Sequence, residues 1–258
     1  MDFTPQKYKE LIATFIKKGY ECISYETYCE AKQQDKTLPE KFVILRHDVD
    51  LEAKRSAVIA QIEHELGAKA VYYFRFIPES NQPEIIQQII ALGHEVGYHY
   101  EDMTVCQGDD TAAYTHFCKW LAYFRTFYPV KTVCMHGSPR SKYDAKDLWR
   151  NHTLSGIGII GEPYLTTDFN DVLYLTDTGR CWDGAKYSVR DKVDQATSLS
   201  FHTTNDIINT LNDVVSPMPN HIMITTHPQR WIGQKLPWLL EWIKQNVKNQ
   251  IKRLLIRS

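Results

Sequence analysis

Residues 41–50 read KFVILRHDVD, and this stretch decides how the rest of the chain is interpreted. Its apolar run, 42–45, is typical of a strand that is buried on both faces. Asp48 and Asp50 follow two residues apart, so both project to the same side of an extended chain. Ionisable groups directly after a buried strand are costly unless they are paired or bind a metal. The stretch therefore predicts a chemically active strand end, although Asp50 alone could instead cap a helix that starts near Leu51.

The same unit, a short strand followed by a helix, repeats along the chain. Strands are expected at 41–46, 70–76, 95–100, 131–136, 157–160, 171–175 and 221–226, and helices at 51–66, 82–92, 111–128, 204–215 and 236–256. Alternation of this kind makes parallel β-α-β units, and about seven units favour an α/β barrel, closed or nearly so, over an open doubly wound sheet. Residues 1–258 are expected to form one domain. Thr4 as a cap and Pro5 at the first helical position add a helix over about 4–20.

The composition excludes several classes of function. Hydrophobic residues make up 43% of the chain and charged residues 24%, as in a folded soluble protein. The formal net charge of −1 removes the basic excess expected of a nucleic-acid-binding protein. No apolar stretch approaches about 18 residues, so no membrane span is expected. The charged N-terminus lacks the apolar core of a signal peptide, and the six scattered cysteines indicate thiols in a reducing compartment, so a cytoplasmic location is expected.

The last predicted helix is amphipathic. Trp238, Leu239, Trp242, Ile243 and Val247 recur at helical spacing, with lysines on the other face. A stripe of this kind either packs against the rest of the protein or lies on a membrane surface. Packing against the barrel is the expectation here, because the apolar stripe of a helix in a globular protein usually faces the core.

Histidines gather where the predicted strands end. His99 lies at the end of strand 95–100, His136 ends strand 131–136, and His227 follows the last strand. Chemistry in a parallel barrel sits at the carboxyl ends of its strands, so these imidazoles and the two aspartates are expected to converge. Mixed nitrogen and oxygen donors suit a borderline divalent cation. A divalent metal, with Zn²⁺ as the first choice, is therefore the expected cofactor.

These strand ends also form recognisable motifs. RHDVD at 46–50 and GHEVGYHYED at 93–102 resemble those of the NodB-homology polysaccharide deacetylases, carbohydrate esterase family four. With MHGSP, IGEPYL, LTDTGR and TTHPQRW they resemble a branch of deacetylase-like proteins of bacterial surface-polysaccharide biosynthesis, over most of residues 41–231. The resemblance implies a distorted (β/α)₇ barrel and the metal-dependent removal of an acyl group from an amino sugar. It implies Asp48 as catalytic base and His227 as general acid. It also implies Asp50 and His99 as metal ligands.

The chain departs from the family pattern at two places. The second metal-binding histidine of the family would lie four residues after His99, where this chain has Met103. His136 is the first choice for the third ligand and Glu101 the second. The Arg-containing motif of the family's fourth strand is replaced by MHGSPR, which leaves Arg140 as a candidate substrate contact. The residues expected to line a sugar pocket are Glu101, Arg140, Trp182 and Trp231.

The sequence therefore predicts a hydrolase that removes an N-acyl group, acetyl first, from an amino-sugar-containing small molecule or glycan intermediate. Asp48 would accept a proton from the attacking water, and His227 would protonate the departing amine. Two other interpretations stay open at this point. One is an inactive sugar-binding or scaffold protein on the same fold, which Met103 favours. The other is an enzyme that acts on a different sugar amide, by deformylation or amide transfer.

Overall fold

The centre of the molecule is a sheet of parallel strands. The computed structural model describes residues 1–138, 141–183, 193–195, 197–215 and 218–256. Its strands are β1 (Glu21–Ile23), β2 (Phe42–Val49), β3 (Val71–Phe74), β4 (Glu95–Tyr100), β5 (Val133–Met135), β6 (Leu173–Thr176) and β7 (His221–Thr226). They lie in the order β5-β4-β3-β2-β7-β6, and β1 pairs with the first half of β2. Every one of these pairs is parallel, which confirms the predicted α/β class in the form of a distorted, incompletely closed barrel.

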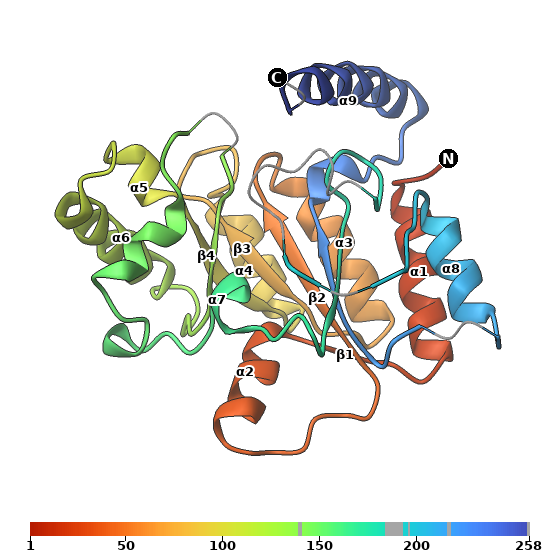
Figure 1. The fold of residues 1–258 in the computed structure, drawn as a ribbon, viewed down its shortest axis with the longest axis horizontal. Helices are drawn as coiled ribbons and strands as arrows, with labels where there is room; N and C mark the ends of the chain where they lie inside the picture. The colour runs from red at the N-terminus through yellow and green to blue at the C-terminus, as the bar shows by residue number, and fades with distance from the viewer. Residues whose placement is uncertain (139–140, 184–192, 196, 216–217, 257–258) are drawn as a thin grey trace.

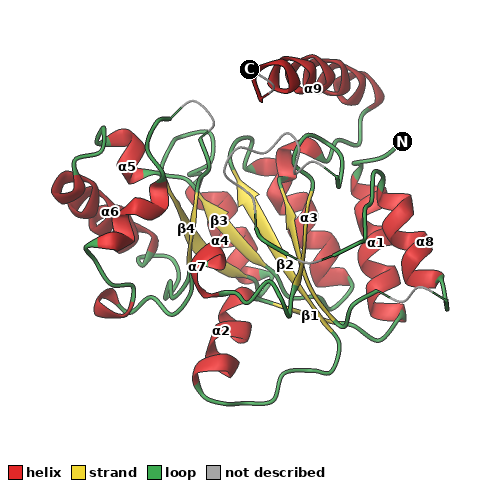
Figure 2. Ribbon diagram, viewed as in Figure 1, coloured by secondary structure: helices red, strands yellow, loops and turns green. Residues whose placement is uncertain are grey.

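Helices surround this sheet (Figures 1 and 2). They are α1 (Pro5–Lys17), α2 (Tyr25–Gln33), α3 (Lys54–Glu65), α4 (Pro83–Ala91), α5 (Asp102–Val105), α6 (Asp110–Phe124), α7 (Pro163–Thr166), α8 (Thr204–Asn212) and α9 (Lys235–Ile256). The added N-terminal helix is confirmed as α1, where the Thr4 side chain accepts a hydrogen bond from the Lys7 amide and Pro5 occupies the first turn. In Figure 1, α9 lies apart from the other helices, above the end of the sheet at which β7 finishes.

One expected strand is absent, and one observed strand was not expected. The segment 157–160 is not a strand: a 3₁₀ turn over Ser155–Ile157 ends at Gly158, whose φ of 71° is left-handed. This turn breaks the extended run, and only Gly161 forms an isolated bridge, to Thr132. The seventh strand is β1 instead. It has only three residues, too few to show an alternation of apolar and polar side chains in the sequence.

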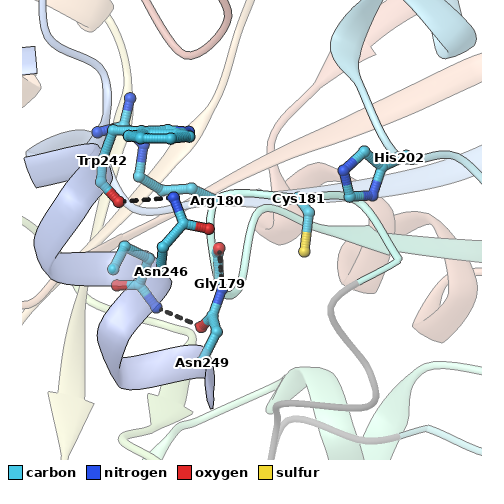
Figure 3. A pocket seen from close by; sticks show the side chains of 8 residues that line it. Gly179, Arg180, Cys181, His202, Trp242, Asn246 and Asn249 are labelled. Atoms are coloured by element: carbon cyan, nitrogen blue, oxygen red, sulfur yellow. Dashed lines mark hydrogen bonds between the residues drawn. The ribbon is translucent and has the colours of Figure 1, made fainter. Parts of the chain in front are cut away.

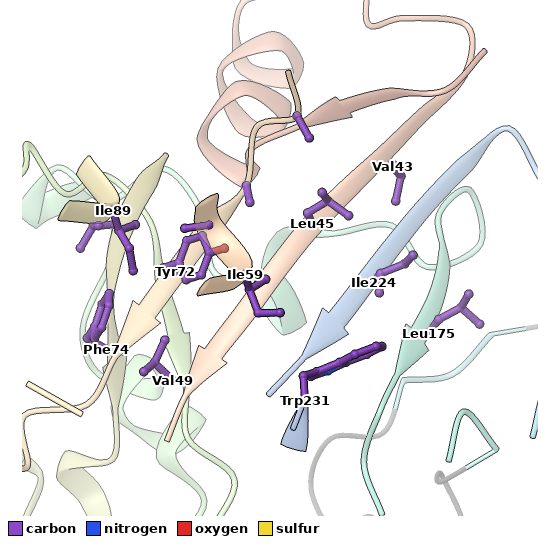
Figure 4. Close-up of a cluster of buried hydrophobic side chains, with 14 of the residues drawn as sticks. Val43, Leu45, Val49, Ile59, Tyr72, Phe74, Ile89, Leu175, Ile224 and Trp231 are labelled. Carbon is purple, nitrogen blue, oxygen red and sulfur yellow. The ribbon is translucent and has the colours of Figure 1, made fainter. Parts of the chain in front are cut away.

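The alternation of side chains along β2 sets the position of the site. Its odd-numbered residues, such as Val43 and Leu45, pack into the larger core beneath the helices (Figure 4). Its even-numbered residues, Phe42 and Ile44, belong to a second apolar cluster on the other face. Because side chains alternate along a strand, Asp48 is expected on this second face at the carboxyl end. The polar carboxyl end of β2 therefore lies directly beside this second apolar cluster.

Candidate metal-dependent active site

Asp50 directly follows β2, and three imidazole rings surround it. Its Oδ1 lies 3.4 Å from Nε2 of His99 and 3.6 Å from Nε2 of His136. Its Oδ2 lies 3.9 Å from Nε2 of His227. Burial opposes ionisation of this carboxyl, but the three imidazoles outweigh it and hold the pKa of Asp50 well below its ordinary value. Strand ends that are far apart in the sequence thus meet around one carboxylate, as the sequence predicted.

His99 and His136 are held so that Nε2 of each ring faces Asp50. Nδ1 of His99 lies 3.0 Å from the carbonyl oxygen of Cys134, which can only accept, so Nδ1 carries the hydrogen. Nδ1 of His136 lies 2.9 Å from Oε2 of Glu101, whose pKa is lowered to about 2 against the effect of burial, chiefly by His136 and Arg75. A ring that donates through Nδ1 keeps Nε2 available as a ligand, which is the usual arrangement behind metal-binding histidines.

The carboxylate of Asp48 accepts hydrogen bonds from a guanidinium of its own strand. Arg46 donates from Nε to Oδ1 at 2.9 Å and from Nη2 to Oδ2 at 2.7 Å. Both side chains are almost completely buried, at 0% and 3% exposure. Burial raises the pKa of Asp48, but Arg46, together with His99 and His227, outweighs this, and the net shift is downward. Asp48 is thus ionised, and its Oδ2 lies 3.8 Å from Nε2 of His99.

His227 is oriented by a carboxylate from the neighbouring strand. Asp177, directly after β6, accepts from Nδ1 of His227 at 2.6 Å and from its backbone amide at 2.9 Å. Trp231 and Arg230 also donate to this carboxylate. Burial and Arg230 oppose protonation of the imidazole, yet Asp177 and Asp50 outweigh them and raise the pKa of His227. The pair leaves Nε2 of His227 directed at Asp50, 3.9 Å from its Oδ2.

Part of the donor set around Asp50 suits a tetrahedral divalent ion, although Asp50, His99 and His136 do not bring all three ligand atoms within 4.8 Å of one another. An ion with bonds of about 2.0–2.1 Å separates its ligand atoms by about 3.3–3.5 Å. The distances from Asp50 Oδ1 to the nitrogens of His99 and His136 lie at this separation or just above it. Asp50 Oδ1 is also buried and has no hydrogen-bond partner among the described residues. A buried, ionised oxygen that accepts no hydrogen bond is costly unless it binds a cation, so Asp50 Oδ1 is a candidate metal ligand.

A second grouping shares His99. In the described part of the chain, Asp48, His99 and Cys134 each bring one potential ligand atom to within 4.8 Å of the others. Both oxygens of Asp48, however, already accept from Arg46. Asp50 is the carboxylate that retains an unengaged oxygen. We therefore favour Asp50 and His99 as ligands and Asp48 as their neighbour.

Other predicted site residues lie elsewhere than expected. Glu101 does not face a sugar pocket: Oε1 accepts from Nε and Nη2 of Arg75 and Oε2 contacts His136, so this carboxylate supports a candidate ligand. Met103 lies in α5 and is buried in the larger core at 7% exposure. Arg140 lies outside the described residues.

The two tryptophans expected to stack on a sugar are packing residues. Trp182 is 5% exposed and Trp231 2%, and their rings lie 6.2 Å apart within the larger core. Their indole nitrogens are also engaged, with Trp182 donating to Thr204 and Trp231 to Asp177. Buried rings with bonded N–H groups cannot offer a face to a pyranose, so this expectation is corrected. Asp50, likewise, caps no helix, because α3 begins after Ala53 and has no side-chain cap.

Sequence reasoning missed three supporting residues. Asp177 directly follows the apolar strand β6, just as Asp50 follows β2, so a carboxylate at a strand end was the available signal. Gln229 donates to Asp50 Oδ2 at 3.1 Å, but nothing in its local sequence marks it. Arg75 follows β3 directly and was a charged residue at a strand end.

Comparisons with known proteins give weak matches only. No protein-family model matches the chain, and no curated protein is significantly similar. The deacetylase PplD of Streptococcus pyogenes, solved with acetate, is 14% identical with a TM-score of 0.44, over 50% of this chain and 61% of that one. A CE4 esterase of Streptococcus mutans is 13% identical with a TM-score of 0.46, over 92% and 90%. A family 4 carbohydrate esterase of Streptomyces lividans, solved with acetate, is 14% identical with a TM-score of 0.39, over 83% and 90%.

Proposed function

We propose that the protein is a metal-dependent hydrolase that removes an N-acyl group, acetyl in the first instance, from an amino sugar. The observation that carries this proposal is the placement of an ionised base and a proton-bearing imidazole beside one candidate metal site. Asp48 lies next to His99, and Nε2 of His227 lies next to Asp50. The substrate we propose is an amino-sugar precursor or glycan intermediate of surface-polysaccharide synthesis in the cytoplasm.

The metal would be held by Asp50, His99 and His136, with Zn²⁺ as the first choice for this set of one oxygen and two nitrogens. When bound, such an ion supplies Lewis acidity, which polarises the acyl carbonyl and acidifies water. Glu101 orients His136 through Nδ1, so the chain determines which nitrogen faces the ion.

Asp48 and His227 would divide the proton transfers of amide hydrolysis. Arg46 keeps Asp48 ionised, so its carboxylate can take the proton of the water that attacks the acyl carbon. The C–N bond then breaks only if the amine leaves with a proton, and Nε2 of His227 lies at the site to give it. Asp177 holds the opposite nitrogen and stabilises the protonated ring.

The test is acyl release measured alongside metal content. We expect stoichiometric divalent metal in protein purified without chelator and acetate release from an N-acetylated amino sugar. Asp48→Asn and His227→Ala should each lower kcat by about 10²–10⁴. His221→Ala is the matched control, because His221 begins the same strand β7 and contacts Asp171 at 3.0 Å, outside the site.

Two results would contradict the proposal. One is protein that neither binds added Zn²⁺ nor gains activity from it. The other is loss of acetate release in His221→Ala equal to that in His227→Ala. Binding of an amino sugar by the metal-loaded protein without acyl release would instead favour the inactive sugar-binding interpretation.

A further inference from the structure

The helix α9 turns its apolar side away from the protein. Residues spaced three or four apart on its inner side are polar or mixed: Trp238, Glu241, Gln245 and Asn249, the last only 8% exposed. Trp242 is 47% exposed but lines a cavity on the protein side of the helix. Among residues 235–250, the apolar side chains on the other side are exposed, by 67% at Leu236, 45% at Leu239, 60% at Leu240, 48% at Ile243 and 55% at Val247. An amphipathic helix of a globular protein normally does the reverse. The expectation that this stripe packs on the barrel is therefore wrong.

Polar contacts hold α9 in this orientation. The indole of Trp238 donates to the carbonyl oxygen of Asp2 at 2.6 Å. The side-chain amide of Asn249 donates to the carbonyl oxygen of Gly179 at 2.9 Å (Figure 3). The guanidinium of Arg180 lies 5.0 Å from the Trp238 ring. A cavity of about 110 Å³ remains between the helix and this loop. The seam beneath α9 is thus polar, and it leaves the apolar stripe without a partner in the described part of the chain.

The charges of α9 flank the apolar stripe. At about 100° per residue, Leu236, Leu240, Ile243 and Val247 fall within an arc of about 60°. Lysines lie on both borders: Lys244 and Lys248 on one side and Lys235 on the other, all exposed. The acidic residue among 235–250, Glu241, is on the inner side. Lysine stems can lie along an apolar surface while the ammonium groups reach out to anions.

We propose that α9 docks the protein on the surface of an anionic lipid bilayer. The apolar stripe of Leu236, Leu240, Ile243 and Val247 would enter the boundary between headgroups and acyl chains. Lys235 and Lys248 would pair with lipid phosphates, whereas Lys244 already pairs with Glu241 at 3.3 Å. A second copy of the chain fits less well, because an isologous contact across this stripe brings lysines of both copies to one rim, and the carboxylate of Glu241 is already paired within its own helix. Charge complementarity thus selects the bilayer.

Docking through α9 would also orient the candidate active site. The helix begins eight residues after His227, and only the short turn Pro228–Arg230 and a few further residues separate it from β7. In Figure 1 it lies at the end of the sheet where β7 finishes. The strand ends that carry the site would therefore face the headgroup layer. Bilayer binding itself does not depend on the proposed chemistry, so each can fail without the other.

The test is flotation of the full chain with phosphatidylcholine vesicles and with mixed phosphatidylcholine–phosphatidylglycerol vesicles. We expect binding to the mixed vesicles that weakens with added salt. Lys248→Gln should weaken it about fivefold, the effect of one lysine near a charged surface. Ile243→Gln combined with Val247→Gln should weaken it more than about tenfold. Val58→Gln on α3, a valine that is 50% exposed, and Lys32→Gln on α2 are the matched controls and should not change it.

Quenching by brominated lipid reports the contact directly. In Leu240→Trp, which places an indole on the stripe, tryptophan fluorescence should fall on mixed brominated vesicles by more than it does in the wild type. Failure of the wild type to bind mixed vesicles at low salt overturns the proposal, as does quenching in Leu240→Trp that is no greater than in the wild type. A dimer seen by sedimentation equilibrium, which dissociates in the Ile243→Gln, Val247→Gln variant and does not float with lipid, would assign the stripe to a second copy instead.

Discussion

Replacement of Arg46 by Met tests whether the site rests on a buried ion pair. The guanidinium and the Asp48 carboxylate are joined by two hydrogen bonds of 2.7 and 2.9 Å at essentially zero exposure. Removal of one partner of such a pair leaves an uncompensated buried charge, which costs about 3–5 kcal/mol. Met replaces the aliphatic part of the Arg46 side chain and carries no charge, so most of the cost comes from the stranded carboxylate. We expect Arg46→Met to lose that amount of unfolding free energy at pH 7.

The loss should depend on pH in a definite direction. In the wild type the folded-state pKa of Asp48 is lowered, so its contribution is present above the unfolded pKa and is lost as pH falls through the folded one. In Arg46→Met, burial without the guanidinium raises the pKa of Asp48. The variant therefore takes up a proton on folding and regains stability as pH falls. The difference between the two proteins should be smaller at pH 5 than at pH 7.

Urea denaturation of metal-stripped protein measures these differences. The double variant Arg46→Met, Asp48→Asn should recover most of the loss, because the stranded charge is gone. Arg150→Met is the matched control: its partner Asp147 lies at a similar distance, 2.8 Å, but Arg150 is 76% exposed, so about 0.5 kcal/mol or less is expected. A loss below about 1 kcal/mol in Arg46→Met, or a double variant less stable than the single one, would refute the reasoning.

Three further predictions follow from other contacts. Glu101→Gln removes the charge behind a candidate metal ligand and should weaken metal affinity about 10–100-fold in competition with a chelating dye. Burial raises the pKa of Glu95 from 4.5 to about 8, so the folded state holds a proton that the unfolded state releases, and stability should fall as pH rises through this window. Glu95→Gln should remove a slope of up to about 1.4 kcal/mol per pH unit from urea midpoints measured across it. Gly97→Ala would bring a Cβ within 2.5 Å of the Tyr73 ring and should cost about 1–3 kcal/mol in urea unfolding, whereas Gly233→Ala, with its nearest contact at 3.8 Å, should be nearly neutral.

Strand ends were the part of the site that the sequence by itself determined. Alternation of apolar runs and helices dictates parallel strands, and parallel strands bring their carboxyl ends to one edge. Asp48, Asp50, His99, His136 and His227 could therefore be grouped without coordinates. The period of two along β2 also placed the two aspartates on one side of the chain. These features are local, or follow from topology, so a linear pattern is enough to reveal them.

Only the tertiary structure decided which partner each group takes. Glu101 supports His136 because Arg75, which directly follows the neighbouring strand β3, occupies its other oxygen. Trp182 and Trp231 were expected to contact a sugar, but both are buried. Their positions after strands do not reveal whether a ring faces the core or the solvent.

The orientation of α9 shows the same limit most clearly. Helical periodicity reveals that a helix has an apolar and a polar side, and this was evident from the spacing of its tryptophans and aliphatic residues. It does not reveal which side the rest of the protein covers. That choice depends on donors and acceptors contributed by distant segments, here the carbonyl groups of Asp2 and Gly179 that meet Trp238 and Asn249. The sequence determines the two faces of a helix, whereas the folded chain around it determines which face is left to solvent.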